Sequence, residues 1–188
     1  MNLFLLQTSG YFAYLSAAAT GITFLTGILF FSVGKPFGKI NDISSILQLV
    51  SMIPLTVLFA NIIPAHPPLL GWIIALLGAG GMLVSIVGQS LLVVGVIDFQ
   101  GSRKFFPAGG AIGLWLILVC LTGSASGQLE GLAFWPGLLA GAGYLATVLG
   151  FLFGGQDHPA FYLGGSLLGI SYPIWAVALG MLINAKGL

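Results

Sequence analysis

Long apolar runs recur along almost the whole chain, and they limit its possible folds more than any other feature. Six of them are long enough to cross a hydrocarbon core of about 30 Å, which takes about 20 residues of helix. The runs lie near residues 10–33, 43–63, 68–97, 105–124, 131–153 and 160–184. Backbone amides inside lipid must find partners within the chain, and the alternating period of barrel strands is absent. The runs are therefore predicted to be helices.

Charged residues are too scarce to build a water-exposed surface. The chain has five Lys and Arg and four Asp and Glu in 188 residues, and its mean hydropathy is +1.11. A soluble domain carries about a quarter charged residues. The connections between the runs are too short to form a separate domain. The sequence therefore predicts an all-α integral membrane protein, a compact bundle of six transmembrane helices in a single domain over residues 1–188.

Basic residues in the short connections predict how the bundle is oriented, because positive charge is retained on the cytoplasmic side. Lys35 and Lys39 precede the second run, and Arg103 and Lys104 precede the fourth. Six crossings place these two pairs on one side, whereas the other side has only Lys186. Both termini are therefore expected to be non-cytoplasmic. The connections expected in the cytoplasm are 34–42, 98–104 and 154–159.

The only two histidines, His66 and His158, are each followed by a proline. The expected topology puts them at opposite membrane faces, so they cannot share one metal or haem iron, whose bonds to nitrogen are about 2 Å long. Proline is favoured at the first position of a helix, and a polar residue before it helps to satisfy the helix start. We interpret both histidines as helix-start residues. The alternative is that one of them ligates a pigment, and no metal site is predicted.

The two His-Pro pairs also suggest an internal symmetry. Each pair opens the third helix of a three-helix half, and halves with an odd number of helices are inverted relative to each other, as in many transporters. Identity between the halves is barely above what a composition rich in Gly and Leu gives by chance. Two inverted three-helix halves are one hypothesis, and similar helix-start chemistry in two unrelated connections is the other.

Glycines recur at four-residue spacing inside the predicted helices. Gly137 and Gly141 share one helix face, and so do Gly165 and Gly169. A missing side chain lets another backbone approach closely. We expect most of these faces to pack within the bundle. Short helices also leave small faces for other membrane subunits or for a second copy of the chain, so association is expected in addition to contact with membrane lipid.

Two tryptophans, Trp115 and Trp175, lie deep within their runs. Large rings at such positions either form the core or pack against a bound lipid, quinone or pigment, and both interpretations stay open. Pro54 and Pro173 also fall inside runs. A proline removes a backbone hydrogen bond, so these two helices are expected to bend.

Neutral polar side chains follow helical spacing in the first half of the chain and form a polar seam. Amides in hydrocarbon need hydrogen-bond partners, so these residues are expected to face one another or a buried ligand. One interpretation is hydrogen bonding between helices, and the other is a site for a neutral polar molecule or a cofactor headgroup. The seam residues are Thr20, Thr23, Gln48, Ser51, Ser85 and Gln89.

Residues for catalysis are scarce. Asp42, Asp98, Glu130 and Asp157 are all expected at or beyond helix ends, so no carboxylate pair is expected within the membrane to relay protons. The sequence has no HExxH, CxxC, phosphate-cradling or GxSxG motif. Five basic residues cannot form a nucleic-acid surface. Neither an enzyme nor a nucleic-acid partner is expected.

Two functions therefore remain. The first is a non-catalytic accessory or scaffold subunit that packs within a larger, energy-converting membrane complex and contacts lipid or cofactor. It explains the glycine faces, the short connections and the scarcity of catalytic groups, and it is the favoured hypothesis. The second is a small channel or facilitator for a neutral solute, which explains the polar seam, the two prolines and the possible inverted halves.

Overall fold

The computed structural model describes residues 3–34, 36–62 and 68–186, and these residues contain no strand. The described parts of the connections contain three short 3-10 turns, η1 (Gly101–Phe105), η2 (Gly131–Ala133) and η3 (Gly155–Asp157). The described part of the chain has six helices that are long and apolar enough to cross a membrane, as the sequence predicts. They are α1 (Leu3–Ser32), α2 (Pro36–Ile62), α3 (Pro68–Val93), α4 (Phe106–Ala125), α5 (Trp135–Gly154) and α6 (Pro159–Lys186).

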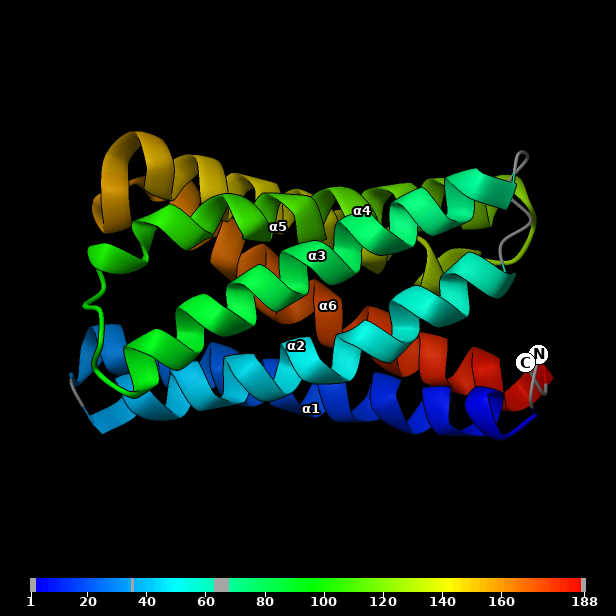
Figure 1. Ribbon diagram of the computed structural model, residues 1–188, viewed down its shortest axis with the longest axis horizontal. Helices are drawn as coiled ribbons and strands as arrows, with labels where there is room; N and C mark the ends of the chain where they lie inside the picture. Colours follow the sequence, from blue (N-terminus) through cyan, green and yellow to red (C-terminus); the bar gives the residue numbers. More distant parts are fainter. Residues whose placement is uncertain (1–2, 35, 63–67, 187–188) are drawn as a thin grey trace.

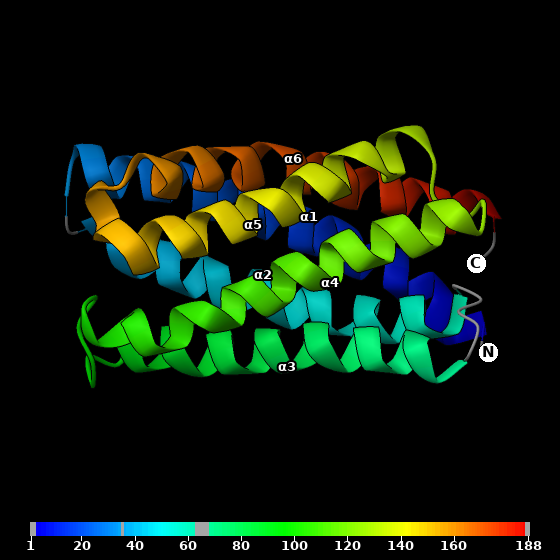
Figure 2. The same ribbon diagram turned by 90° about the horizontal axis from the view of Figure 1, so that it is seen from above.

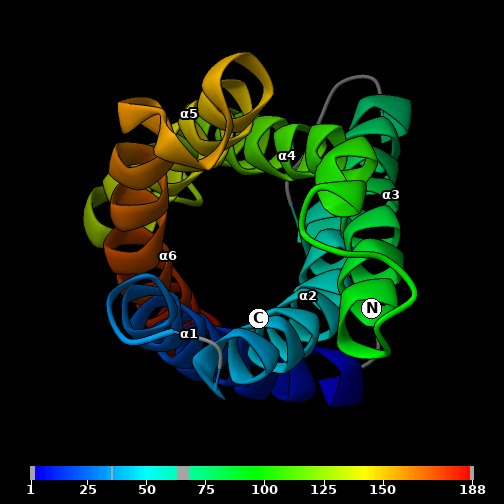
Figure 3. The ribbon, with the colours of Figure 1, turned by 90° about the vertical axis from the view of Figure 1, so that its left-hand side faces the viewer.

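The six helices form a closed ring. Each helix packs against the next one in chain order, and α6 packs against α1. Figure 3 shows this ring end-on, with the helices following one another around a common axis. The two side views show that the start of α1 and the end of α6 lie at one end of the ring (Figures 1 and 2). The α1–α2, α3–α4 and α5–α6 connections lie at the opposite end, which we call the connection end.

Four helix boundaries differ from the sequence prediction by about four residues or more. The first helix begins at Leu3 and not near residue 10, and the fifth begins at Trp135 and not near residue 131. The second helix begins at Pro36 and not near residue 43, because proline suits the first helical position, where its missing amide proton is not needed. Asp42 therefore lies inside α2, and the expectation that it lies at or beyond a helix end is wrong. The third helix ends at Val93 and not near residue 97. Gly95 follows with a φ of 76°, a left-handed conformation that is common just after a helix ends.

Large apolar side chains point outward from the ring along most of its length. Leu76, Phe153 and Leu163 are 69%, 83% and 70% exposed. Contiguous apolar surface of this kind needs a cover of lipid or protein. Together with the length and hydropathy of the helices, it fits a multi-pass membrane protein.

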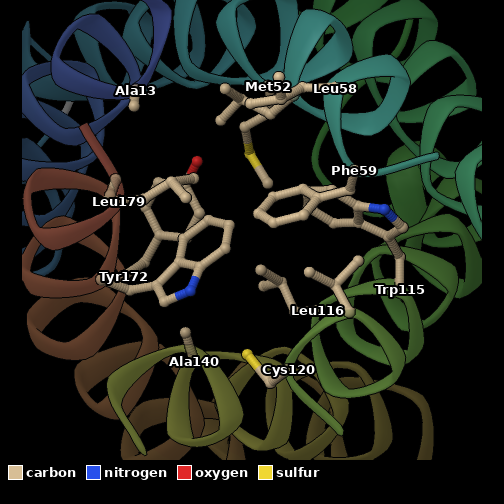
Figure 4. Packing of buried hydrophobic residues seen from close by; sticks show 14 of the residues in the cluster. Ala13, Met52, Leu58, Phe59, Trp115, Leu116, Cys120, Ala140, Tyr172 and Leu179 are labelled. Atoms are coloured by element: carbon tan, nitrogen blue, oxygen red, sulfur yellow. The ribbon is translucent and has the colours of Figure 1, made fainter. Parts of the chain in front are cut away.

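The half of the ring nearer the chain ends is filled by an aromatic plug, made of Phe59, Trp115, Tyr172 and Trp175. Both tryptophans are fully buried. Phe59 stacks on Trp175 with 6.0 Å between ring centroids and an angle of 21°. Trp115 meets Trp175 edge-on, with centroids 6.3 Å apart at 89°. Figure 4 shows the rings of Phe59, Trp115 and Tyr172 at the centre of the ring of helices, with Met52 and Leu116 beside them.

Two glycines make room for the plug. A Cβ atom at Gly78 of α3 would lie 2.6 Å from Cδ1 of Trp115, and one at Gly137 of α5 would lie 2.5 Å from Nε1 of Trp175. Real Cβ atoms do not come this close to another heavy atom. The large rings of α4 and α6 therefore occupy space that a side chain on the neighbouring helix would need.

Candidate functional site: a cavity open at one end

A cavity of about 770 Å³ enters the ring from the connection end, and all six helices contribute to its wall. Its deepest lining residues lie near the middle of their helices. They include Thr20, Gln48, Ile112, Tyr144 and Leu168. The aromatic plug lies farther along the same helices and fills the ring from there on. The ring is therefore hollow in one half and packed in the other.

Aromatic side chains form much of the cavity wall. Phe31 of α1 meets Tyr162 of α6 edge-on, with ring centroids 5.5 Å apart. Phe106 of α4 stacks on the buried Phe151 of α5 at 3.8 Å. The aromatic lining residues are Phe24, Phe30, Phe31, Phe99, Phe105, Phe106, Tyr144, Phe161 and Tyr162. Such a wall suits the apolar part of a ligand.

Most of the polar seam lies on the same cavity wall. The seam residues that line the cavity are Thr20, Thr23, Gln48, Ser85 and Gln89. They come from α1, α2 and α3, which are neighbours in the ring. Ser51 is not part of the wall. It is buried in α2, and its hydroxyl donates a hydrogen bond to the carbonyl of Leu47.

Some of the seam residues hydrogen-bond between helices. Thr23 Oγ1 of α1 donates to Ser44 Oγ of α2 at 2.8 Å. Gln48 Nε2 of α2 donates to the hydroxyl of Tyr144 of α5 at 3.1 Å, across the ring. Tyr144 was not singled out in the sequence, because it is a single polar group in an apolar run and its partner is 96 residues away.

The side chains of two seam residues on α3 have no hydrogen-bond partner among the described residues. The Oε1 atom of Gln89 is buried and accepts no hydrogen bond. The hydroxyl of Ser85, one helical turn earlier, also lines the cavity and makes no hydrogen bond within the described part of the chain. Leaving a buried acceptor without a donor costs about 1–3 kcal/mol. A bound molecule that supplies a donor would remove this cost once the Gln89 amide turns its oxygen toward the cavity.

One cation and one anion also line the cavity. Lys39 and Asp42 lie one turn apart near the start of α2. Among the described residues they are the only charged groups in the wall. Their opposite charges cancel, so the wall has no net formal charge. Arg103 lies outside the cavity, where its Nη2 donates to the carbonyl of Leu152 at 2.7 Å, near the end of α5.

The other candidate binding residues lie away from the cavity. Trp115 and Trp175 belong to the aromatic plug, and their indole N–H groups have no partner among the described residues. His158 is exposed, and its Nδ1 accepts a hydrogen bond from the backbone N–H of Ala160 at 3.2 Å. This is the contact that a helix-start residue makes. His66 lies outside the described residues.

The four glycines at helical spacing have different surroundings. A Cβ atom at Gly137 would meet the aromatic plug, and one at Gly141 would lie 2.7 Å from the carbonyl oxygen of Gly113 in α4. A Cβ atom at Gly169 would meet the ring of Phe24. Gly165 has no atom within 4 Å of its Cβ position and lines the cavity.

Comparison with known protein families, characterised proteins and solved structures finds no match. Among the described residues, no three His, Cys, Asp or Glu side chains lie close enough together to hold a metal ion. The function is therefore inferred from the cavity, its lining and the plug that closes it.

Proposed function

We propose that this protein is a membrane facilitator for a small uncharged molecule, which it binds in the cavity. The cavity carries the proposal, because its volume of about 770 Å³ falls within the range of about 300–1,000 Å³ for small-molecule sites. Protein interiors are normally close-packed, with few voids larger than a water molecule. A subunit that only packs against neighbours has no need of such a space in its own interior.

The proposal includes membrane insertion, with the connection end in the cytoplasm. Lys39, Arg103 and Lys104 lie at this end, and positive charge is retained on the cytoplasmic side. Both termini would then lie on the opposite side. In this orientation the cavity takes up its ligand from the cytoplasm or releases it there.

Passage through the ring requires the aromatic plug to open. Two prolines are well placed to allow this motion. Pro54 lies in α2 between Met52 and Phe59, and Pro173 lies in α6 between Tyr172 and Trp175. A proline removes one backbone hydrogen bond and gives a helix a place to bend. Movement of α1–α3 against α4–α6, the two proposed inverted halves, would open the plug and close the cavity.

The accessory-subunit hypothesis stays a prediction, as do its partners. The outward apolar surface fits a cover of lipid as well as contact with other membrane subunits or a second copy of the chain. The predicted lipid, quinone or pigment would find space in the cavity and not at Trp115 or Trp175, which are fully packed.

The proposed function is tested by filling the cavity. Gly165→Trp places a large ring in open space on the cavity wall, whereas Gly80→Trp places the same ring on the exposed outer face of α3. Exchange of radiolabelled uncharged solutes, from glycerol and urea to aromatic amides and alcohols, is measured in proteoliposomes. We expect faster exchange of at least one solute than in protein-free liposomes, and its loss in Gly165→Trp only.

No acceleration of any solute by the unmutated protein would contradict the facilitator. In that case, stable partners in a native purification would support the accessory subunit instead. Equal exchange in the unmutated protein and Gly165→Trp would show that the solute does not pass through the cavity.

A further inference from the structure

The residues of the polar seam differ in whether their hydrogen-bonding groups are already used. Thr20 Oγ1 donates to the carbonyl of Ser16 at 2.7 Å, and Thr23 and Gln48 bond to α2 and α5. The side chains of Ser85 and Gln89 make no hydrogen bond within the described part of the chain. Two seam side chains that make no hydrogen bond within the described residues therefore lie together on α3, in the cavity wall.

These two residues are arranged to hold one polar group. Ser85 and Gln89 are four residues apart, so they are neighbours on one helix face with Cβ atoms about 5–6 Å apart. The hydroxyl of Ser85 supplies a donor. The Gln89 amide supplies an oxygen that accepts no hydrogen bond within the described residues, and a half-turn of the amide presents this oxygen to the cavity. An oxygen that carries a hydrogen matches both, because it accepts from Ser85 and donates to Gln89.

Aromatic rings stand next to this polar pair. A Cβ atom at Gly88, the residue before Gln89, would lie 2.7 Å from Cγ of Phe105, so the Phe105 ring packs directly on α3. Phe106 lines the cavity next in the chain and stacks on Phe151. The polar pair is therefore bordered by apolar surface, which suits a ligand with one polar end.

The charges of the wall disfavour an ion. Lys39 and Asp42 cancel each other, so neither sign of ligand is attracted by a net charge. Lys39 is exposed, and its ammonium group is accordingly hydrated. A charged ligand would lose its own hydration inside a membrane protein without gaining a dedicated partner, which is costly.

We infer that the cavity binds an uncharged ligand with a compact apolar body and a hydroxyl group, and that Ser85 and Gln89 hold this hydroxyl. The inference deepens the proposed function, on which it rests, because it names the class of molecule that the facilitator takes. Such an alcohol is available both from the bilayer and from the cytoplasm.

A matched series of probes tests the ligand class. Binding of each probe to the protein in lipid nanodiscs is measured by equilibrium dialysis, and its binding to nanodiscs without protein is subtracted. The probes share a phenyl body and differ in their polar end: phenethyl alcohol, phenethyl methyl ether, ethylbenzene, phenylacetate, phenethylammonium and the zwitterion phenylalanine. We expect the alcohol to bind about three- to tenfold more tightly than the ether, which accepts but does not donate. The three ionic probes should bind more weakly still. Farnesol, an alcohol that resides in the bilayer, is then added as a competitor of phenethyl alcohol. Displacement of phenethyl alcohol by farnesol would assign the natural ligand to the membrane, and a lack of displacement would assign it to the cytoplasm.

Two variants test the assigned contacts. Gln89→Leu removes the acceptor, so it should weaken alcohol binding about three- to tenfold and leave ether binding unchanged. Ser85→Ala removes the donor, so it should weaken both. Gln128→Leu makes the same change outside the cavity. Ser126→Ala removes a hydroxyl outside the cavity that already donates to the carbonyl of Gly123 at 3.0 Å. Both control variants should bind the alcohol as the unmutated protein does.

Equal affinity for alcohol and ether in the unmutated protein would overturn the inference, and so would tightest binding of an ionic probe. Unchanged alcohol binding in both Gln89→Leu and Ser85→Ala would overturn the assigned contacts. Binding is measured here without transport, so the two proposals can fail separately. Solute exchange with no preference for the alcohol contradicts only the ligand class, whereas alcohol binding without exchange contradicts only the facilitator.

Discussion

The two halves of the ring are built from the same six helices and differ in what those helices place inside. In α4, Gly109 lies on the cavity wall, and Trp115 lies in the aromatic plug. In α6, Gly165 lines the cavity, and Trp175 fills the plug. Glycine and tryptophan both occur in membrane helices. In α4 and α6, the volume of these side chains therefore distinguishes the hollow half from the packed half.

The same change takes place within α2, where polarity changes together with size. Ser45 and Leu49 line the cavity, whereas Met52, Leu55 and Phe59 are buried one to three turns later. On α2 the cavity half thus carries mostly polar side chains, which offer hydrogen bonds, while the aromatic side chains of the cavity wall come from elsewhere in the ring. The plug half combines large apolar and aromatic side chains, which close the ring by packing.

Loss of a plug ring should have the largest effect on stability. Trp175→Ala removes a fully buried ring that contacts Phe59, Trp115 and Tyr172, and such truncations cost about 3–5 kcal/mol. Trp135→Ala is the control, because Trp135 is 61% exposed on the outer surface. Thermal unfolding of both variants in nanodiscs should show a large fall in Tm for Trp175→Ala only. Equal falls would mean that the plug is no better packed than the surface.

Adjacent glycines of α6 should respond differently to an added methyl group. A Cβ atom at Gly164 would lie 2.7 Å from the carbonyl oxygen of Gly143 in α5, whereas Gly165 faces open cavity. Gly164→Ala should therefore cost about 1–3 kcal/mol through overpacking. Gly165→Ala should be neutral, or more stable by up to about 1 kcal/mol, because alanine favours helix. If thermal unfolding showed Gly165→Ala to be less stable than Gly164→Ala, Gly165 would not face the cavity.

Hydrogen bonds should matter more in the plug than in the cavity. Tyr172 donates to Ser16 Oγ at 3.0 Å between buried residues, so Tyr172→Phe should cost about 1 kcal/mol. Gln48→Leu breaks the bond to Tyr144, but the tyrosine hydroxyl then faces the cavity and water reaches it. This change should cost about 0.6 kcal/mol or less, the average for bonds between membrane helices. A larger Tm loss for Gln48→Leu would argue that water does not enter the cavity.

The sequence predicted the six helices better than the arrangement of side chains inside the ring. Hydropathy is a local property, so the six helices could be found from their runs. The start of α2 was missed because Lys39, Asn41 and Asp42 interrupt the apolar pattern, although Pro36 is a favourable first residue. The spacing of Gln48 and Gln89 indicated inward polar faces. Their different bonding could not be predicted, because it depends on Tyr144, which a distant helix brings to Gln48 when the ring closes.

The division of the ring into a hollow and a packed half is tested most directly by cysteine accessibility along α2. Cys120, the only native cysteine, is replaced by Ala, and single cysteines are introduced at inward positions. Labelling by a small, charged thiol reagent is measured by mass spectrometry for protein in nanodiscs. We expect rapid labelling at positions 42, 45 and 49, which line the cavity, and protection at positions 52, 55 and 59, which are buried in the other half. Labelling that continues to position 59 would show an open pore, and protection at positions 45 and 49 would show that the cavity does not exist.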